Sequence, residues 1–368
     1  MGTVAWRPLW GRTGIALGVF AVTAVLLGSS AGLSSPHGQA GAPPPTGLAP
    51  CEVKLQLPTP ICHVFVVFLE NQEEKVAYNA TFEHYLATHY AFAADYHSIL
   101  HYSFPNYLAA TAGYKQNLVH PMGKKNLVDL INSRTPKLSW YSFEESMLYP
   151  CWRNGTSAYR VTHNPFVWYS DVYNNFTNCK FHDTTFTTWN TLVSKNTVPN
   201  YAFFAPNTTD DCWRFGLSLC DAWLHSWLTP YVNASWFANS AFIVTYDEGW
   251  TNDTTSSNGT VGGGHVYTVA VSPYACKGYV STHPYNHYDL FTTTEWLLDL
   301  PSLGGIYQDN WTADPPMKDL FCFPNGTTQN TLPFGGGHAP GSSTISVVGP
   351  PALLVKARDE LPIRGVAL

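Results

Sequence analysis

Two pairs of adjacent residues with oxygen-bearing side chains directly follow apolar runs that are predicted to be buried strands. Glu70 and Asn71 follow the run HVFVVFL, and Asp247 and Glu248 follow the run AFIVTY. If these two strands are neighbours in one sheet, four oxygen ligands converge above its edge. Such a set suits a hard or borderline divalent cation. The alternative interpretation is that these side chains are solvated loop residues.

A third chemical feature is Ser103, which stands at the expected N-cap of a helix. Pro105 lies in the first turn, and Gly113 comes just past the expected end, which is typical of helix boundaries. As a structural residue, Ser103 would only cap the helix. As a reactive residue, its hydroxyl lies where backbone N–H groups and the helix dipole favour an anion such as phosphate. A metal beside it would lower the hydroxyl pKa and supply a nucleophile without a histidine partner.

The elements that must position these residues alternate along the chain. Short, continuous apolar runs predict strands covered on both faces, at residues 63–69, 201–205, 241–246 and 266–271. Helices are expected between them, at residues 81–90, 105–112, 124–132, 221–231 and 290–298. This alternation predicts an α/β fold, a three-layer sandwich with a mostly parallel central sheet. In such sheets the chemistry lies at the carboxyl ends of the strands.

The composition excludes several classes of protein. Of 368 residues, 12% are charged, against roughly 25% in an average soluble domain, and the net charge is −6. Without a basic cluster, a dedicated nucleic-acid binder is excluded. A hydrophobic content of 45% excludes disorder, and a single long apolar run excludes a multi-span membrane protein. The chain also carries 13 Trp, 21 Tyr and 20 Phe, which predicts a large core with polar edges.

The first 50 residues predict export. Arg7 and Arg12 precede an uncharged run at 14–28, and small residues follow, so residues 1–31 are predicted to be a secretory signal peptide. The uncharged stretch continues to Leu33, which leaves an uncleaved membrane anchor as the alternative. Residues 32–50 are expected to be a flexible linker. A domain at 51–332 and a poorly structured tail at 333–368 complete the expected organisation.

Glycosylation and disulfides are the expected substitutes for surface charge in an exported chain. The N-x-[ST] pattern occurs at Asn79, Asn154, Asn175, Asn207, Asn233, Asn252, Asn258, Asn310 and Asn325. An even number of cysteines indicates up to four disulfides, from Cys51, Cys62, Cys151, Cys179, Cys212, Cys220, Cys276 and Cys322. Proximity in sequence favours Cys51 with Cys62 and Cys212 with Cys220. A composition rich in Asn and Thr could also produce the sequons passively.

Six short motifs occur in one order along the chain and together carry a resemblance. They are E-N at 70–71, S-x-P-N-Y at 103–107, H-N-P-F at 163–166, P-N at 206–207, T-Y-D-E-G at 245–249 and Y-N-H-Y at 285–288. The chain thereby resembles the phosphoesterase family of metal-dependent acid phosphatases and bacterial-type phospholipases C. That family lies within the alkaline phosphatase superfamily, so the resemblance implies an alkaline-phosphatase-like fold for residues 62–304.

The resemblance also implies roles for particular residues. Ser103 matches the family's nucleophile, which also touches the metal, and Asn106 matches a donor to a phosphate oxygen. His163 matches a histidine that contacts the phosphate or protonates the leaving group. His287 lies in a segment usual for the family and either contacts the phosphate or is a buried structural histidine. The implied metal ligands are Glu70, Asn71, Ser103, Asp247 and Glu248. His265, which follows a Gly-rich loop, is expected to have no catalytic role.

The chain departs from the family pattern at one position. Family members commonly show Asp-x-His-Asp after the P-N segment, whereas this chain has Asp211-Cys212-Trp213-Arg214. Trp213 therefore stands where a phosphate-facing histidine is expected. Either Arg214 supplies the positive charge, as a bidentate phosphate binder can, or protonation of the leaving group rests on His163 alone.

The expected function is that of a secreted, metal-dependent phosphoesterase that hydrolyses phosphate monoesters through a phosphoserine. The expected cofactor is one divalent ion, and an all-oxygen ligand set accepts calcium, magnesium, manganese or zinc. Small phosphate esters or phospholipids are the expected partners, with membrane contact only through the N-terminal segment or a lipid substrate. One alternative is phospholipase C activity. The other, from a different class, is a catalytically weak glycoprotein that binds ligands on the same fold.

Overall fold

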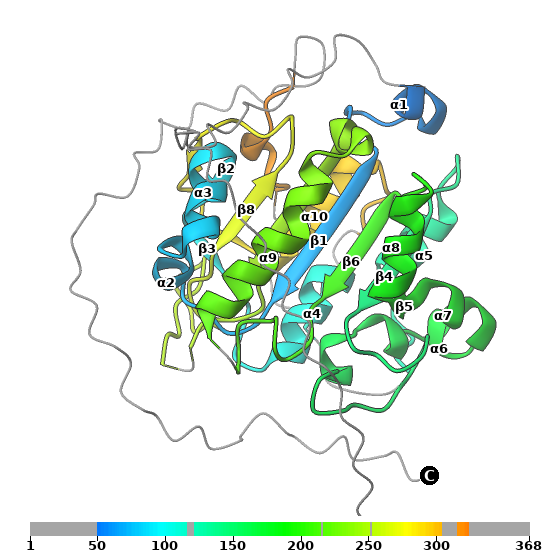
Figure 1. Ribbon diagram of the computed structural model, residues 1–368, viewed down its shortest axis with the longest axis horizontal. Coiled ribbons are helices and arrows are strands. Elements are labelled where there is room, and N and C mark those ends of the chain that lie inside the picture. Colours follow the sequence, from blue (N-terminus) through cyan, green and yellow to red (C-terminus); the bar gives the residue numbers. More distant parts are fainter. Residues whose placement is uncertain (1–49, 116–120, 215, 251, 304–314, 324–368) are drawn as a thin grey trace, which may run out of the picture. The chain divides into compact units, whose positions relative to one another are not determined.

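The computed structural model describes residues 50–115, 121–214, 216–250, 252–303 and 315–323 (Figure 1). The predicted signal segment, nearly all of the linker, the tail, and the sequons at Asn310 and Asn325 lie outside these residues. Among the residues described, no helix is both long enough and apolar enough to cross a membrane.

The core of the fold is an eight-stranded sheet in the order β5-β4-β6-β1-β7-β8-β2-β9. Its five strands from β5 to β7 are parallel, and β8 runs antiparallel to its neighbours β7 and β2. The strands are β1 (His63–Leu69), β2 (Ala91–Ala93), β4 (Trp140–Glu144), β5 (Asp183–Thr185), β6 (Tyr201–Ala205), β7 (Ser240–Tyr246), β8 (Thr268–Val271) and β9 (Val280–Ser281). The predicted α/β fold with a mostly parallel sheet is confirmed. A separate parallel pair joins β3 (Tyr96–His97) to β10 (Tyr285–Asn286).

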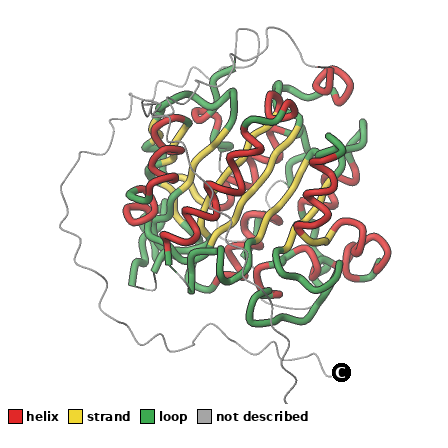
Figure 2. The backbone as a smooth tube through the Cα atoms, in the orientation of Figure 1, coloured by secondary structure: helices red, strands yellow, loops and turns green. Residues whose placement is uncertain are grey.

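Helices lie on both sides of the sheet (Figure 2). They are α1 (Pro50–Leu55), α2 (Glu74–Tyr78), α3 (Thr81–His89), α4 (Ser103–Ala112), α5 (Leu127–Ser133), α6 (Ser170–Tyr173), α7 (Phe176–His182), α8 (Phe186–Ser194), α9 (Leu217–Val232) and α10 (His287–Leu297). Short 3-10 turns are η1 (Val161–His163), η2 (Phe166–Trp168), η3 (Ser235–Asn239) and η4 (Lys318–Leu320). All five expected helices are present, and α9 begins four residues earlier than expected.

Aromatic side chains of β1 join the sheet to both helical layers. Phe65 packs edge-on against Trp189 of α8, with ring centroids 5.5 Å apart. Phe68 packs against Tyr107 of α4 at 4.7 Å. Side chains separated by an odd number of positions point to opposite faces of a strand, so α8 and α4 cover opposite faces. This is the predicted three-layer arrangement, and it accounts for much of the aromatic content.

Every cysteine is paired. The bonds are Cys51–Cys62, Cys151–Cys179, Cys212–Cys220 and Cys276–Cys322. Both pairs that sequence proximity favoured are therefore confirmed.

Candidate active site

The two predicted ligand pairs lie side by side at the carboxyl edge of the sheet. Strands β1 and β7 are adjacent and parallel, with Leu69 opposite Tyr246, so the residues that follow them leave the sheet together. The backbone N–H of Asn71, a residue with the left-handed φ of 41°, donates to Oδ1 of Asp247 at 3.0 Å. The register of the two strands thus brings the two pairs to the same edge of the sheet, which was the condition for the predicted metal site.

Helix α4 brings Ser103 to this edge. Its Oγ lies 3.2 Å from Oε2 of Glu70 and 3.4 Å from Oε1 of Glu248, so the hydroxyl faces one carboxylate from each strand end. The predicted N-cap was wrong by one residue: Ser103 is the first helical residue, and Tyr102 is the cap. Gly113 ends the helix in the left-handed conformation, as expected.

The backbone at Tyr102 is strained, with φ at 105°, a value that a residue with a side chain rarely adopts. Its N–H donates to Oε2 of Glu248 at 3.0 Å. The same oxygen lies 2.7 Å from Nδ1 of His101, whose Nε2 is 2.6 Å from the Asp253 carbonyl. The hydrogen bond with Glu248 raises the pKa of His101 against the opposing effect of burial. These contacts fix both Glu248 and the turn that presents Ser103.

Glu70 is held by two further side chains. The hydroxyl of Tyr107 donates to Oε1 of Glu70 at 2.6 Å, and Nε2 of His163 lies 3.3 Å from the same oxygen. The rings of Tyr107 and His163 stack, with centroids 5.4 Å apart. Tyr107 was not predicted as a site residue, although it stands four positions after Ser103 and therefore on the same side of the helix.

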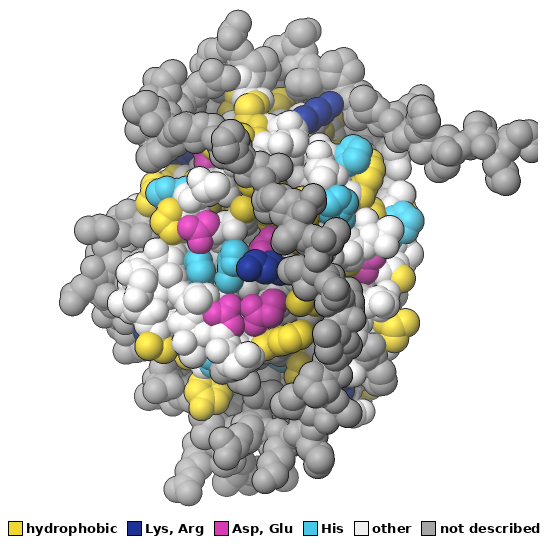
Figure 3. All heavy atoms as spheres, turned by 90° about the vertical axis from the view of Figure 1, so that its left-hand side faces the viewer, with side chains coloured by type: hydrophobic (Ala, Val, Ile, Leu, Met, Phe, Trp, Pro, Cys, Tyr) yellow, Lys and Arg dark blue, Asp and Glu magenta, His cyan; other side chains and the backbone are white. Residues whose placement is uncertain are grey.

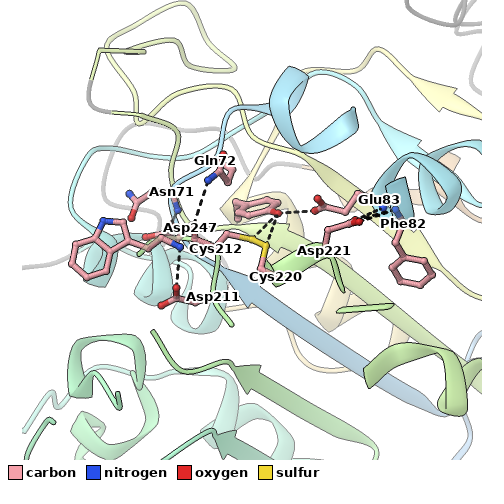
Figure 4. Close-up of a disulfide and its surroundings, with 11 residues drawn as sticks. Asn71, Gln72, Phe82, Glu83, Asp211, Cys212, Cys220, Asp221 and Asp247 are labelled. Atoms are coloured by element: carbon pink, nitrogen blue, oxygen red, sulfur yellow. Dashed lines mark hydrogen bonds between the residues drawn. A yellow bond between two sulfur atoms is a disulfide. The ribbon is translucent and has the colours of Figure 1, made fainter. Parts of the chain in front are cut away.

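Asp211 is a second residue that the sequence reasoning did not place in the site. Strand β6 neighbours β1, and the chain beyond it returns so that the Asp211 carbonyl accepts the N–H of Glu70 at 2.7 Å. Asp211 and Asp247 both lie near the Cys212–Cys220 disulfide (Figure 4). The Asp211 carboxylate accepts the N–H of Trp213 at 2.9 Å.

The site is a buried concentration of negative charge. Burial, followed by the charges of Asp247 and Asp211, raises the pKa of Glu70 well above its usual range. Burial and the charge of Glu248 do the same for Asp247. Oδ2 of Asp247 is buried and has no hydrogen-bond partner among the described residues. Buried carboxylates without a compensating charge are costly, so this donor set fits a bound divalent cation.

The amide of Asn106 is buried and satisfied within the chain. Its Oδ1 accepts the N–H groups of Ile99 and Leu100, at 3.0 and 3.3 Å. Its Nδ2 donates to the Leu100 carbonyl at 2.6 Å. In this arrangement Asn106 holds the loop that leads into Ser103. Its predicted contact with phosphate stays a prediction, and it would require one of these bonds to be exchanged.

His287 lies beneath the site. Its Nε2 contacts the Asp247 carbonyl at 2.7 Å, and its Nδ1 contacts the Tyr96 hydroxyl at 3.0 Å. Burial lowers its pKa to about 4. With both ring nitrogens engaged, His287 supports the turn that carries Asp247, and a phosphate contact stays a prediction.

Positive charge gathers beside Trp213. The Arg214 guanidinium lies 5.0 Å from the centre of the Trp213 ring, and that of Arg160 lies at 6.0 Å. Burial and the charge of Arg160 lower the pKa of His163 to about 3. Arg214 is exposed. The second cation, Arg160, immediately precedes the turn of His163. Nothing in the sequence motifs singled it out.

The chain is similar in sequence to several known proteins. A model of the phosphoesterase family matches residues 68–301. An acid phosphatase of Aspergillus fumigatus is 27% identical over 65% of this chain and 55% of its own length. A phosphatidylinositol-3-phosphatase of Mycobacterium tuberculosis is 28% identical over 76% of this chain and 88% of its own. A protein of the alkaline phosphatase superfamily from Vibrio parahaemolyticus superposes with a TM-score of 0.43 at 11% identity, over 65% of this chain and 66% of that one.

The matched region covers only part of this chain and only part of each fungal enzyme. This chain spans little more than half the length of the acid phosphatases from Aspergillus fumigatus and Kluyveromyces lactis, at 55% and 59%.

Proposed function

Because this chain belongs to the phosphoesterase family, we propose that it hydrolyses phosphate monoesters, with Ser103 as its nucleophile. One observation carries the proposal: the Ser103 hydroxyl, at the start of α4, faces Glu70 at 3.2 Å and Glu248 at 3.4 Å. A hydroxyl held between carboxylates from two adjacent strands is arranged for reaction beside a cation, and capping alone would not require it.

Four residues would hold the divalent cation: Glu70, Asn71, Asp247 and Glu248. When bound, the cation acts as a Lewis acid that offsets phosphate charge and lowers the pKa of a neighbouring hydroxyl. The unpartnered Oδ2 of Asp247 supports this role. His101 positions Glu248 and Tyr107 positions Glu70, each through a hydrogen bond.

The chain's own residues account for the transfer. The Ser103 hydroxyl gives up its proton to solvent, and its Oγ forms a bond to phosphorus as the bond to the leaving oxygen breaks, which gives a phosphoserine. N–H groups in the first turn of α4 face the phosphate oxygens, and the guanidinium of Arg160 or Arg214 adds positive charge. His163 has a pKa of about 3 without phosphate, because of burial and the charge of Arg160. The negative charge of a bound phosphate raises that pKa, so His163 takes up a proton and donates it to the departing oxygen. Water then hydrolyses the phosphoserine.

The test is hydrolysis of an aryl phosphate with and without a chelator, by wild type and by Ser103→Ala. The proposal expects metal-dependent turnover in wild type and a loss of more than a thousandfold in the variant. Ser226→Ala is the matched control, because Ser226 is an exposed helical serine that bonds only a carbonyl of its own helix. Retained activity in Ser103→Ala contradicts the nucleophile assignment. Absence of both hydrolysis and bound metal in wild type supports the binding-protein alternative.

A lipid substrate is the second candidate, and two exposed aromatic residues favour it. Tyr102, next to Ser103, is 56% exposed, and Trp250, two residues after Glu248, is 41% exposed. Aromatic side chains of this kind can enter a membrane interface. Release of phosphate from phosphatidylinositol phosphate vesicles would identify a lipid monoesterase, and release of diacylglycerol from phosphatidylcholine vesicles would identify phospholipase C activity.

Export is part of the proposal. Four disulfides suit an oxidising compartment. Of the seven sequon asparagines that the structure describes, six are exposed and Asn207 is half-buried. A mass decrease on treatment with a peptide N-glycosidase, together with sequencing of the mature N-terminus, tests glycosylation and signal cleavage.

A further inference from the structure

A second group of metal-binding side chains lies apart from the carboxylates around Ser103. Asp95, His97 and His265 each offer a ligand atom, and these atoms all lie within 4.8 Å of one another. Histidine and acidic side chains adjoin one another on the face of the molecule drawn in Figure 3. Nothing in the proposed phosphoester chemistry uses these three residues.

The backbone places the three residues in a fixed relation. Asp95 and His97 are two positions apart, so their side chains leave the same side of the extended segment. His97 pairs with His265 in an antiparallel bridge, and the rings stack with centroids 4.8 Å apart. Gly263 allows this close approach, since a Cβ there would lie 2.2 Å from Oγ of Ser98.

Hydrogen bonds set each imidazole for metal binding. Nε2 of His265 lies 2.7 Å from the Ala94 carbonyl, so this nitrogen donates a proton and Nδ1 keeps its lone pair. Metal-binding histidines are typically oriented in this way. Nε2 of His97 faces Oδ1 of Asp95 at 2.7 Å, so an ion bound between these two atoms would replace their hydrogen bond. The other ring nitrogen of His97, Nδ1, is buried and has no hydrogen-bond partner among the described residues.

We propose that Asp95, His97 and His265 bind a divalent transition-metal ion of the zinc class. Two imidazoles and one carboxylate suit such an ion, unlike the all-oxygen set near Ser103. Ligands of a tetrahedral zinc lie about 3.4 Å apart, given bond lengths of about 2.1 Å. The facing atoms of Asp95 and His97 are 2.7 Å apart, so the Asp95 side chain, which is 43% exposed, must move back slightly, and the His265 ring must turn toward the ion. Water takes the remaining position.

The ion would tie together two segments that lead into the phosphoesterase site. Beyond His97, the chain passes through His101 to Ser103. The N–H of His265 donates to the Asp253 carboxylate at 2.9 Å, and the Asp253 carbonyl contacts His101. The role is therefore structural, in keeping with the expectation that His265 has no catalytic part.

The experiment measures zinc per chain by mass spectrometry on full-length protein that has been treated with a chelator and then equilibrated with Zn²⁺. We expect the double variant H97A/H265A to bind one ion fewer than wild type. The control H84A/H89A removes two exposed histidines of α3 and should keep the wild-type stoichiometry. Equal stoichiometry in wild type and H97A/H265A overturns the proposal.

Two further variants keep the test decisive. Should H97A/H265A fail to fold, Asp95→Asn changes a half-exposed side chain and should weaken zinc binding at least tenfold; unchanged affinity counts against the site. E70Q/D247N removes ligands of the other site and should retain the zinc at the histidines, so failure of one site is distinguishable from failure of the other. With Co²⁺, the visible bands of nitrogen ligation should appear in wild type and E70Q/D247N and be lost in H97A/H265A.

Discussion

Removal of the Tyr107 hydroxyl tests whether the site depends on a precisely held Glu70. Tyr107 is buried, with 1% of its surface exposed, and its hydroxyl donates to Oε1 of Glu70 at 2.6 Å. Tyr107→Phe keeps the ring that packs on Phe68 and His163, so it deletes one hydrogen bond without opening a large cavity. A hydrogen bond to a charged group contributes about 1.5–3 kcal/mol, and loss of a residue that orients a metal ligand typically lowers metal affinity about 10- to 100-fold.

The assay is aryl phosphate hydrolysis by chelator-treated enzyme as the divalent ion is titrated back. The metal concentration for half-maximal activity should rise about 10- to 100-fold in Tyr107→Phe, while kcat at saturating metal falls much less. Tyr267→Phe is the matched control, because this buried hydroxyl bonds the Glu83 carbonyl and touches no predicted ligand. If Tyr107→Phe needs the same metal concentration for half-maximal activity as wild type, Tyr107 does not hold Glu70 for metal binding, whether or not kcat falls.

Three further predictions address the leaving group, the support of Glu248 and stability. His163→Gln should slow esters of poor leaving groups at least tenfold more than p-nitrophenyl phosphate, because only poor leaving groups need a proton; equal slowing of both would argue against this role. His101→Phe should raise the metal concentration for half-maximal activity, because it loses the 2.7 Å contact with Glu248. An unchanged concentration would show that His101 does not position Glu248 for metal binding. Burial raises the pKa of Glu83 to about 8, so folding favours its protonated form. Stability should fall as pH rises from about 4.5 to 8, by at most roughly 1.4 kcal/mol per pH unit from this one group. In urea unfolding over that pH range, the free energy of unfolding should fall less steeply with pH in Glu83→Gln than in wild type. An identical slope would show that Glu83 does not cause the pH dependence.

Continuous apolar runs made the central strands predictable. β1 and β6 match their predicted bounds, because strands covered on both faces need no polar alternation. β4 (WYSFE) and β5 (DTT) were missed, since polar residues interrupt them and only pairing within the sheet makes them strands. β2 was missed because three residues carry too little pattern.

Part of the site followed from motifs, and the rest depended on tertiary structure. Glu70, Ser103 and Asp247 stand at element ends, where the sequence marks them. Asp211 reaches Glu70 only because β6 neighbours β1, a fact of sheet order that local pattern does not contain. The Asn106 amide bonds the backbone of the loop before Ser103, and local sequence pattern does not predict that loop's conformation. Tyr107 could have been found from its helical spacing to Ser103.

The most direct test of the account is whether phosphate becomes bound to Ser103 during turnover. Wild-type enzyme is mixed with an aryl phosphate, quenched in acid within one turnover, digested and analysed by mass spectrometry. The account predicts a phosphoryl group on the peptide that contains Ser103, at that residue, and its absence in Ser103→Ala together with loss of hydrolysis. Undiminished hydrolysis by Ser103→Ala, or a phosphoryl group on a different residue of the wild-type enzyme, would contradict it.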